Sequence, residues 1–209
     1  MNAEKISVAR LFEKDIEILF NEKTKLINGF VNSQQIKHDL TPEGLERIKD
    51  TVFERLWKWP DIQIDRSKIK RDSKDVLLSP DDALEVLYPG KNQIEFAFHK
   101  ATLAIYTLPY TGASDALHYS TKGNGFEFTG SSSGSNLEVY LYTNKEITEE
   151  IALEIRSKRD KILDRIDKVL HENRSYVTSK VEDFKKLISD LVDNSYYKEK
   201  KRNDINNLL

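Results

Sequence analysis

The chain contains no cysteine among its 209 residues. Disulfides, thiolate metal sites and cysteine nucleophiles are therefore excluded. An excess of one charge is also lacking, since 33 lysine and arginine residues stand against 35 aspartate and glutamate residues. This balance argues against a globally basic nucleic-acid-binding protein but leaves local basic patches open.

Long apolar runs are missing too. No segment approaches the ~20 consecutive apolar residues of a membrane span, and the first 20 residues carry charges in every turn, unlike a signal peptide. We therefore expect a cytoplasmic protein that does not associate with membranes. Because 33% of the residues are charged, much of the apolar content should lie on amphipathic faces.

Helix breakers are few, with 8 glycines and 5 prolines, and none follows Gly134. The predicted fold class is α+β, with N-terminal helices, a central antiparallel β-meander of four or five strands and a long C-terminal helical hairpin. The chain is expected to divide into residues 1–143, helices plus sheet, and residues 144–209. The amphipathic helices of the second part should pack with the N-terminal helix as one unit.

The first part of the chain shows helical signals. Apolar residues at three- and four-residue spacing predict a helix over residues 4–32. Thr41 as N-cap and Pro42 at the first helical position predict a second helix that ends near Trp59. A short helix is expected over residues 80–88.

The middle of the chain changes period. Apolar residues alternate with polar or small ones near residues 94–98, 103–107 and 137–141, which is typical of half-buried strands. The sheet should therefore lie within residues 92–143, with one apolar face. The other face is expected to carry Tyr106, Glu138, Tyr140 and Tyr142.

The last part shows two apolar stripes. A capping box, Thr143 to Glu146, predicts the helix start. The stripes at residues 147–170 and 177–191 do not join smoothly across residues 171–176, so the helix either turns back there or continues with a phase break. A hairpin is favoured, because an exposed helix of about 50 residues needs a partner along its whole length.

The glycine- and serine-rich stretch at residues 119–142 raises the question of a phosphate loop. Such a loop normally lies between a strand and a helix N-terminus, whereas here another strand follows. Residues 122–125 are better explained as a hairpin turn and residues 131–135 as a longer, flexible loop. The alternative is a ligand- or partner-binding loop that uses Tyr110, Gly112, Asn124 and Ser132.

Catalytic patterns are absent from the sequence. The four histidines show no metal-ligand spacing, and the serines between Gly130 and Gly134 lack the strand-to-helix context of a hydrolase nucleophile. We therefore predict no catalytic, metal-binding or cofactor-binding residues, no cofactor and no enzymatic activity.

Two segments, residues 66–74 and 198–202, are rich in basic side chains. Both segments or their surroundings also contain acids, and helix C-termini favour lysine and arginine on electrostatic grounds alone. A solvated surface is the simpler interpretation, with nucleic-acid or partner contact as the alternative. The candidate contacts are Lys68, Lys70, Arg71, Lys200, Lys201 and Arg202.

Several of these features occur together in one known group. The strand end Leu108–Gly112, with its Pro-Tyr-Thr-Gly, resembles a motif in the N-terminal half of uncharacterised bacterial proteins. The later helices match at Ile155, Leu163, Asp164, Ile166, Leu170, Val181, Phe184, Leu187 and the basic run Lys200, Lys201 and Arg202. The chain departs from this group in extra residues near 173–179 and in lacking prolines after the glycine motif. In that group a restriction-endonuclease-like domain with an acid–x–lysine strand follows.

The resemblance implies that this chain is the non-catalytic half of a two-part bacterial nuclease, with antiviral defence as a natural context. The leading hypothesis is therefore an interaction or regulatory module, a sensor or oligomerisation unit, that forms a homo-oligomer through its helices. It would meet a protein partner or a missing C-terminal domain. The alternatives are a nucleic-acid-binding module using the two basic segments and a small-ligand receptor using the loops within residues 111–136.

Overall fold

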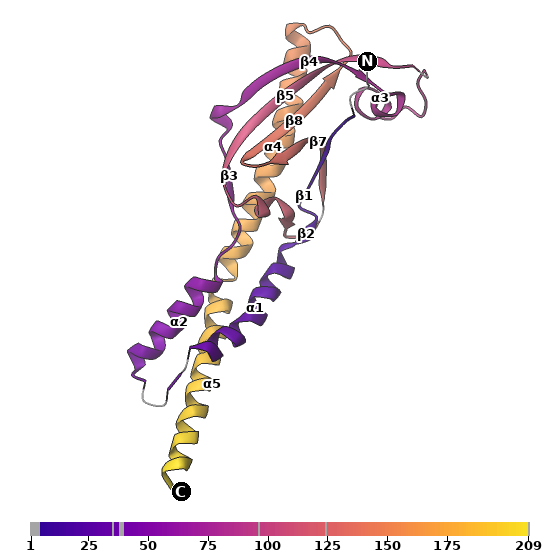
Figure 1. The fold of residues 1–209 in the computed structure, drawn as a ribbon. Coiled ribbons are helices and arrows are strands. Elements are labelled where there is room, and N and C mark those ends of the chain that lie inside the picture. Colours follow the sequence, from indigo (N-terminus) through magenta and orange to yellow (C-terminus); the bar gives the residue numbers. More distant parts are fainter. Residues whose placement is uncertain (1–4, 35, 38–39, 96, 124, 209) are drawn as a thin grey trace.

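The computed structural model describes residues 5–208 apart from residues 35, 38–39, 96 and 124. Figure 1 shows an elongated molecule with two parts, which we call the head and the leg. The head contains the strands, helix α4 and the short helix α3. The leg contains helices α1, α2 and α5. Its C-terminal end lies far from the head.

The strands of the head are β1 (Val8–Leu11), β2 (Lys14–Asp15), β3 (Ile62–Ile64), β4 (Lys70–Leu78), β5 (His99–Gly112), β6 (Tyr119–Ser120), β7 (Phe126–Ser133) and β8 (Asn136–Thr143). The helices of the molecule are α1 (Ile16–Ser33), α2 (Pro42–Leu56), α3 (Pro80–Leu87), α4 (Glu149–Ser179) and α5 (Val181–Leu208). Two short 3-10 helices, η1 (Arg66–Lys68) and η2 (Ser114–His118), lie beside the sheet strands in sequence.

The main sheet has six antiparallel strands in the order β1-β7-β8-β5-β3, with β4 also paired to β5. This confirms the predicted α+β class and the antiparallel sheet. The connections differ from a meander, because β8 lies between β5 and β7 and the N-terminal β1 pairs with β7. A separate parallel pair joins β2 to β6.

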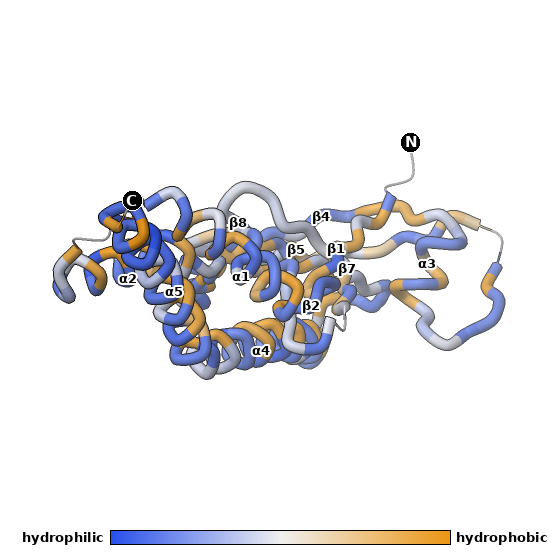
Figure 2. The backbone as a smooth tube through the Cα atoms, turned by 90° about the horizontal axis from the view of Figure 1, so that it is seen from below, coloured by the Kyte–Doolittle hydropathy of each residue, from blue (hydrophilic) through white to orange (hydrophobic). Residues whose placement is uncertain are grey.

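One face of the sheet is covered by α4, which runs behind the strands in Figure 1 and along one side of them in Figure 2. Leu163 and Ile166 of α4 are fully buried in the same core as Leu108 and Val139 of the sheet. Burial of such side chains contributes about 1.5–3 kcal/mol each relative to leaving them exposed. A smaller core forms at the far end of the opposite face, where Ala83 of α3 packs with residues of β4 and β5.

The leg is a three-helix bundle. Its core joins buried residues of α1, α2 and α5, and Phe184 of α5 lies at its centre. The ring of Phe184 is 4.8 Å from that of Trp57 and 6.0 Å from that of Phe20, measured between centroids. Most of the apolar stripe of α5 is therefore buried inside the chain.

The N-terminal helix begins later than the sequence analysis predicted. Residues 8–11 form strand β1, whose side chains alternate between exposed and buried. Phe12 then adopts a positive φ of 62° and is fully buried, a conformation that no helix continues through. Asp15 caps α1 by accepting a hydrogen bond from the Glu17 N–H. The second helix begins at Pro42 with Thr41 as its cap, as expected, and the short helix begins at Pro80.

The predicted C-terminal hairpin is wrong. Helices α4 and α5 follow one another as one long, bent helix from the head into the leg (Figure 1). The break lies at Lys180, not at residues 171–176, and the Lys180 carbonyl already accepts the Phe184 N–H of α5. The reason is that each half finds its own partner: α4 packs on the sheet and α5 packs on α1 and α2.

The start of α4 also differs. The predicted capping box does not form, because Thr143 ends strand β8 and the helix begins at Glu149. Thr148 is the N-cap and accepts the Ile151 N–H. Ladder pairing of Thr143 with Thr102 of β5 outweighs the local capping preference.

Three predicted features of the middle segment need correction. Ile94 and Phe98 lie outside any strand, whereas residues 70–74 of the predicted basic segment belong to strand β4, which the sequence analysis did not predict. In the described part of the chain, the strands on either side of the predicted hairpin turn pair with other strands, β6 with β2 and β7 with β1 and β8. The serines of 131–133 belong to β7, and Gly134, with a φ of 60°, makes a tight turn into β8.

Candidate recognition site on the open sheet face

The face of the sheet opposite α4 carries a cluster of hydroxyl groups around one carboxylate. Cross-strand register places Ser131 of β7, Glu138 of β8 and Thr107 of β5 in one row. Because side chains alternate along a strand, Tyr140 points to the same face as Glu138. We call these four residues the Glu138 cluster.

The hydroxyls of the Glu138 cluster all donate toward the same carboxylate. Ser131 Oγ lies 2.9 Å from Glu138 Oε2, and the Tyr140 hydroxyl donates to the same oxygen. Thr107 Oγ1 lies 3.5 Å from Oε1, at the long limit for a hydrogen bond. Three strands thus hold the carboxylate in one orientation. A carboxylate has about four lone-pair positions, so at least one is not filled by these three hydroxyls.

Burial and the neighbouring carboxylate raise the pKa of Tyr140 above its ordinary value. Burial is the larger cause, because it disfavours the phenolate, and the hydrogen bond to Glu138 adds to it. Tyr140 therefore remains a neutral hydrogen-bond donor around pH 7. Tyr140 also packs against the small core beneath α3, and the charge of Lys74 acts on its pKa in the opposite sense to the Glu138 carboxylate. The cluster thus presents an oriented acceptor on the face that α4 does not cover, and a cationic or hydrogen-bond-donating group has the chemistry to meet it.

The sequence analysis anticipated part of this face. Glu138 and Tyr140 lie on the non-α4 side, as expected, but Tyr106 is buried on the other side, beneath the guanidinium of Arg159. Tyr106 is opposite Val139 in the register, and Val139 faces α4, so the alternation assigns both to the covered face. The missed signal is the register between β5 and β8, which no local pattern contains.

The predicted loop residues Tyr110 and Ser132 do come together. Both line a 390 Å³ pocket between β1, η2 and the β7–β8 turn, together with the exposed His118. The Tyr110 hydroxyl is already used, since it donates to the Gly134 carbonyl at 2.8 Å. Asn124 lies outside the described residues.

Gly112 has a structural role. Its φ is 103°, and a Cβ at this position would lie 2.2 Å from the Asp61 carbonyl oxygen. Only glycine lets β5 approach β3 this closely. The neighbouring Asp61 and Ile62 are in turn held by Arg174 of α4, whose Nε lies 2.9 Å from Asp61 Oδ1.

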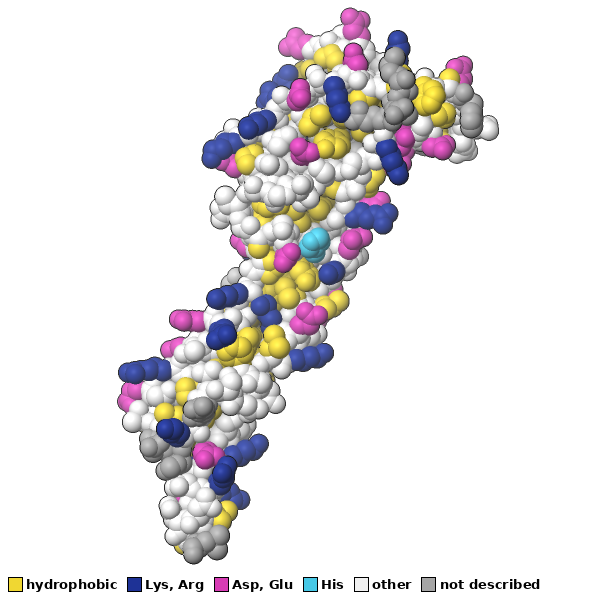
Figure 3. Space-filling view, in the orientation of Figure 1, with side chains coloured by type: hydrophobic (Ala, Val, Ile, Leu, Met, Phe, Trp, Pro, Cys, Tyr) yellow, Lys and Arg dark blue, Asp and Glu magenta, His cyan; other side chains and the backbone are white. Residues whose placement is uncertain are grey.

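The two basic segments lie far apart. Lys68, Lys70 and Arg71 are in the head, whereas Lys200, Lys201 and Arg202 lie near the end of the leg. Lys68 pairs with Asp65 at 3.0 Å, and Arg202 lies 3.8 Å from Glu199. On the face drawn in Figure 3, acidic and basic side chains are interspersed along both parts. The structure therefore does not join the segments into one basic surface.

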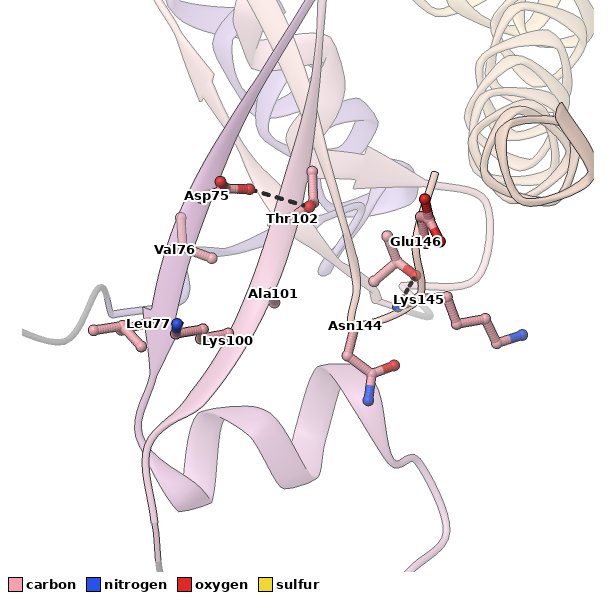
Figure 4. A pocket seen from close by; sticks show the side chains of 10 residues that line it. Asp75, Val76, Leu77, Lys100, Ala101, Thr102, Asn144, Lys145 and Glu146 are labelled. Carbon is pink, nitrogen blue, oxygen red and sulfur yellow. Dashed lines mark hydrogen bonds between the residues drawn. The ribbon is translucent and has the colours of Figure 1, made fainter. Parts of the chain in front are cut away.

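A larger pocket of 610 Å³ lies between β4, β5 and the loop that precedes α4 (Figure 4). Its polar side chains have mixed charge and several are engaged. Asp75 accepts a hydrogen bond from Thr102 at 3.3 Å. Asn144 donates to the hydroxyl of Tyr88, the residue that follows α3. Nothing in this lining selects one class of ligand.

A groove of 700 Å³ lies between α1 and α5 in the leg. Asn28, Asn32 and Asn194 line it, with Arg202 at one end. Arg202 is the one predicted basic contact that reaches a pocket described for the leg. The others, Lys200 and Lys201, are exposed on α5.

Among the residues that the structure describes, no three His, Cys, Asp or Glu side chains gather as metal ligands would. No helix within the described ranges is long and apolar enough to cross a membrane. Comparison with protein-family models, with curated proteins and with solved structures finds no match.

Proposed function

We propose that this chain is a non-catalytic interaction module whose head recognises a partner protein through the open sheet face. The observation that carries the proposal is the Glu138 carboxylate, oriented by hydroxyls from three strands on a surface that α4 leaves open. The partner group with the matching chemistry is a lysine or arginine side chain. A charge-assisted hydrogen bond to a pre-oriented carboxylate is roughly twice as strong as a neutral one.

The leg would set the distance between the recognition face of the head and a second component of the assembly that contacts the C-terminal end of the leg. Because α4 belongs to the core of the head and α5 to the core of the leg, the two parts are linked through helix and not through a loop. This arrangement supports a regulatory or adaptor role in a larger assembly. The resemblance noted above makes a bacterial nuclease-type defence system the proposed setting.

The test is partner capture with a matched pair of variants. We expect the tagged chain to co-purify with a stoichiometric partner that chemical cross-linking attaches to β5, β7 and β8. Glu138→Gln with Tyr140→Phe should abolish capture, because the substitutions remove the charge and its donor without changing side-chain size. Asp204→Asn, on an exposed position of α5, is the control and should retain capture. Equal capture by both variants would contradict the proposal.

A small-ligand receptor is the second candidate, favoured by the pocket that brings Tyr110 and Ser132 together. Its volume lies near the lower end of the ~300–1,000 Å³ typical of ligand sites. A screen of polar metabolites by thermal shift tests it, with His118→Ala as the variant that should lose the response. Nucleic-acid binding is the remaining alternative, and it predicts an affinity that falls steeply with salt.

A further inference from the structure

Strand β4 forms an edge of the sheet. In the described part of the chain it pairs with β5 alone, over all nine of its residues, and Figure 1 shows it as the outermost strand on its side. The first six residues, 70–75, are exposed. Side chains of both charges lie along this edge in Figure 3. A strand of this length with one unpaired side is a template for pairing with another strand.

The backbone groups that point outward can be identified. The Ser73 N–H donates to its neighbour's carboxylate, Asp72 Oδ1, at 2.8 Å, so it is not part of the ladder with β5. Because backbone polar groups alternate sides along a strand, the N–H groups of Arg71 and Asp75 also point away from β5. The N–H groups of Arg71 and Asp75 can therefore pair with a second strand, and that of Ser73 can do so once it leaves the Asp72 carboxylate.

A second copy of this chain can pair with this edge through a two-fold axis. Two copies related by a two-fold axis and joined by antiparallel strands must keep the same faces of the sheet on the same side. The axis then runs midway between one residue and the same residue of the second copy. Every residue that precedes this central residue by some number of positions lies opposite the residue that follows it by the same number in the other copy. Only a few registers meet this condition within β4.

The charges select one of these registers. An axis at Arg71, Asp72, Lys74 or Asp75 places two like charges directly opposite one another. An axis at Ser73 places none. It sets Arg71 opposite Asp75 and Asp72 opposite Lys74, each twice by symmetry. Opposite charges across strands stabilise the pair and like charges destabilise it.

We propose that β4 forms a two-fold symmetric, antiparallel homodimer contact centred on Ser73, which extends the sheet from one copy into the other. A protective role for edge charges explains their presence but does not require this order. Lys70 would lie opposite Val76 of the second copy, at the margin of the contact. The oligomer expected from the sequence is thereby assigned to the sheet edge and not to the helices.

The experiment uses sedimentation velocity of the full chain at micromolar concentrations and low salt. We expect the wild type to shift from the 24.3 kDa monomer toward a dimer as its concentration rises. Arg71→Asp and Asp75→Arg should each weaken dimerisation by about tenfold or more, since each turns attractive cross-strand pairs into repulsive ones. The double variant should recover the dimer.

Mixing the two single variants gives the sharpest outcome. One copy then carries two acids and the other two bases at positions 71 and 75, so a heterodimer should form where neither variant dimerises alone. Lys186→Asp, the same change of charge on the exposed face of α5, is the control and should dimerise like the wild type. Far-ultraviolet circular dichroism confirms that each variant is folded.

Ser73→Pro tests the backbone part of the proposal. Proline removes an N–H that faces away from β5, which an edge strand tolerates, so folding should persist while dimerisation is lost. A wild type that stays monomeric, or single variants that dimerise like the wild type, would overturn the proposal. Glu138→Gln should leave the dimer intact, so failure here is distinct from failure of partner recognition by the open face.

Discussion

The head and the leg are stabilised in different ways. The core of the head contains buried polar side chains. Arg159 and Asn173 of α4 are buried, and the Asn173 side chain donates a hydrogen bond to the Tyr119 carbonyl at 2.6 Å. In the leg, the buried residues described are all hydrophobic, and aromatic rings surround Phe184. A buried polar side chain needs a hydrogen-bond partner at a fixed position, whereas one apolar side chain can often be replaced by another of similar volume. The head should therefore be the more specific part and the leg the more tolerant.

The difference extends to the surfaces. Arg66 of η1 joins Asp164 and Asp167 of α4 at 2.8 and 2.6 Å, and Arg174 joins α4 to β3. These pairs attach the helix to the strands that end near the junction of head and leg. In the leg, Lys49 of α2 bridges to Asp193 of α5 at 3.1 Å. Each such partly exposed pair contributes at most about 1 kcal/mol, so cores dominate the stability of both parts.

The largest expected effect comes from the centre of the leg. Phe184→Ala should lower the free energy of unfolding by about 3–5 kcal/mol, because it removes a fully buried ring and leaves a cavity. Urea denaturation measures the loss, and hydrogen exchange should show it first in α1, α2 and α5. The control Tyr197→Ala, at an exposed site of the same helix, should change stability little. Equal loss of protection throughout the head would show that the two parts unfold as one.

A second test compares two glycines. Gly112→Ala should destabilise the head by roughly 1–3 kcal/mol or more, because it combines a positive φ with a clash against the Asp61 carbonyl. Gly29→Ala in α1 should instead stabilise the leg by about 0.5–1 kcal/mol, since a Cβ there meets nothing within 4 Å. Thermal unfolding of both variants measures these changes in stability. A change of the same sign in both variants would contradict the assignment of Gly112 to close packing between β5 and β3.

The junction between the parts offers a smaller effect. Replacing Ser179 and Lys180 by glycine should cost about 1 kcal/mol per residue in helix propensity. At Lys180 the loss of the ammonium that lies 5.5 Å from the Phe20 ring adds about 0.5–1 kcal/mol. The main expected change is a wider range of orientations between head and leg, because glycine weakens the helical connection between them. Small-angle X-ray scattering should report a broader distribution of distances, while an unchanged profile would mean that contacts other than the helix align head and leg.

The smallest effect concerns pH. The pKa of Tyr140 is raised in the folded state, chiefly by burial, so the folded protein retains this proton more tightly than the unfolded chain. The stabilisation is full below the ordinary tyrosine pKa near 10 and is lost as pH rises through the folded value. Tyr140→Phe should therefore reduce the fall in stability above pH 10 by a few tenths of a kcal/mol. Denaturation midpoints at pH 8 and 10.5 test this, with Tyr197→Phe as control.

Local sequence patterns correctly predicted the structural features that depend on interactions within a few residues. Thr41-Pro42 and Ser79-Pro80 start helices as predicted, because an N-cap oxygen and a proline act within one turn. The candidate site was foretold in part: Glu138 and Tyr140 were placed on the correct face by alternation alone. The cluster itself was not, because Thr107 and Ser131 reach Glu138 only through the register of three strands.

By itself, the sequence determined the α+β class, two of the helix starts and the apolar stripes of α4 and α5. Tertiary structure decided what those stripes cover. An apolar stripe predicts that one face of a helix is buried, but it does not identify the segment that buries it. The same pattern is therefore compatible with a helical hairpin and with a long helix that passes from a sheet to a helical bundle. Residues 8–11 show the same dependence, because a four-residue strand gains its stability from pairing with β7 and not from its own composition. Burial against distant segments supplies the energy that settles such choices, and local sequence does not contain it.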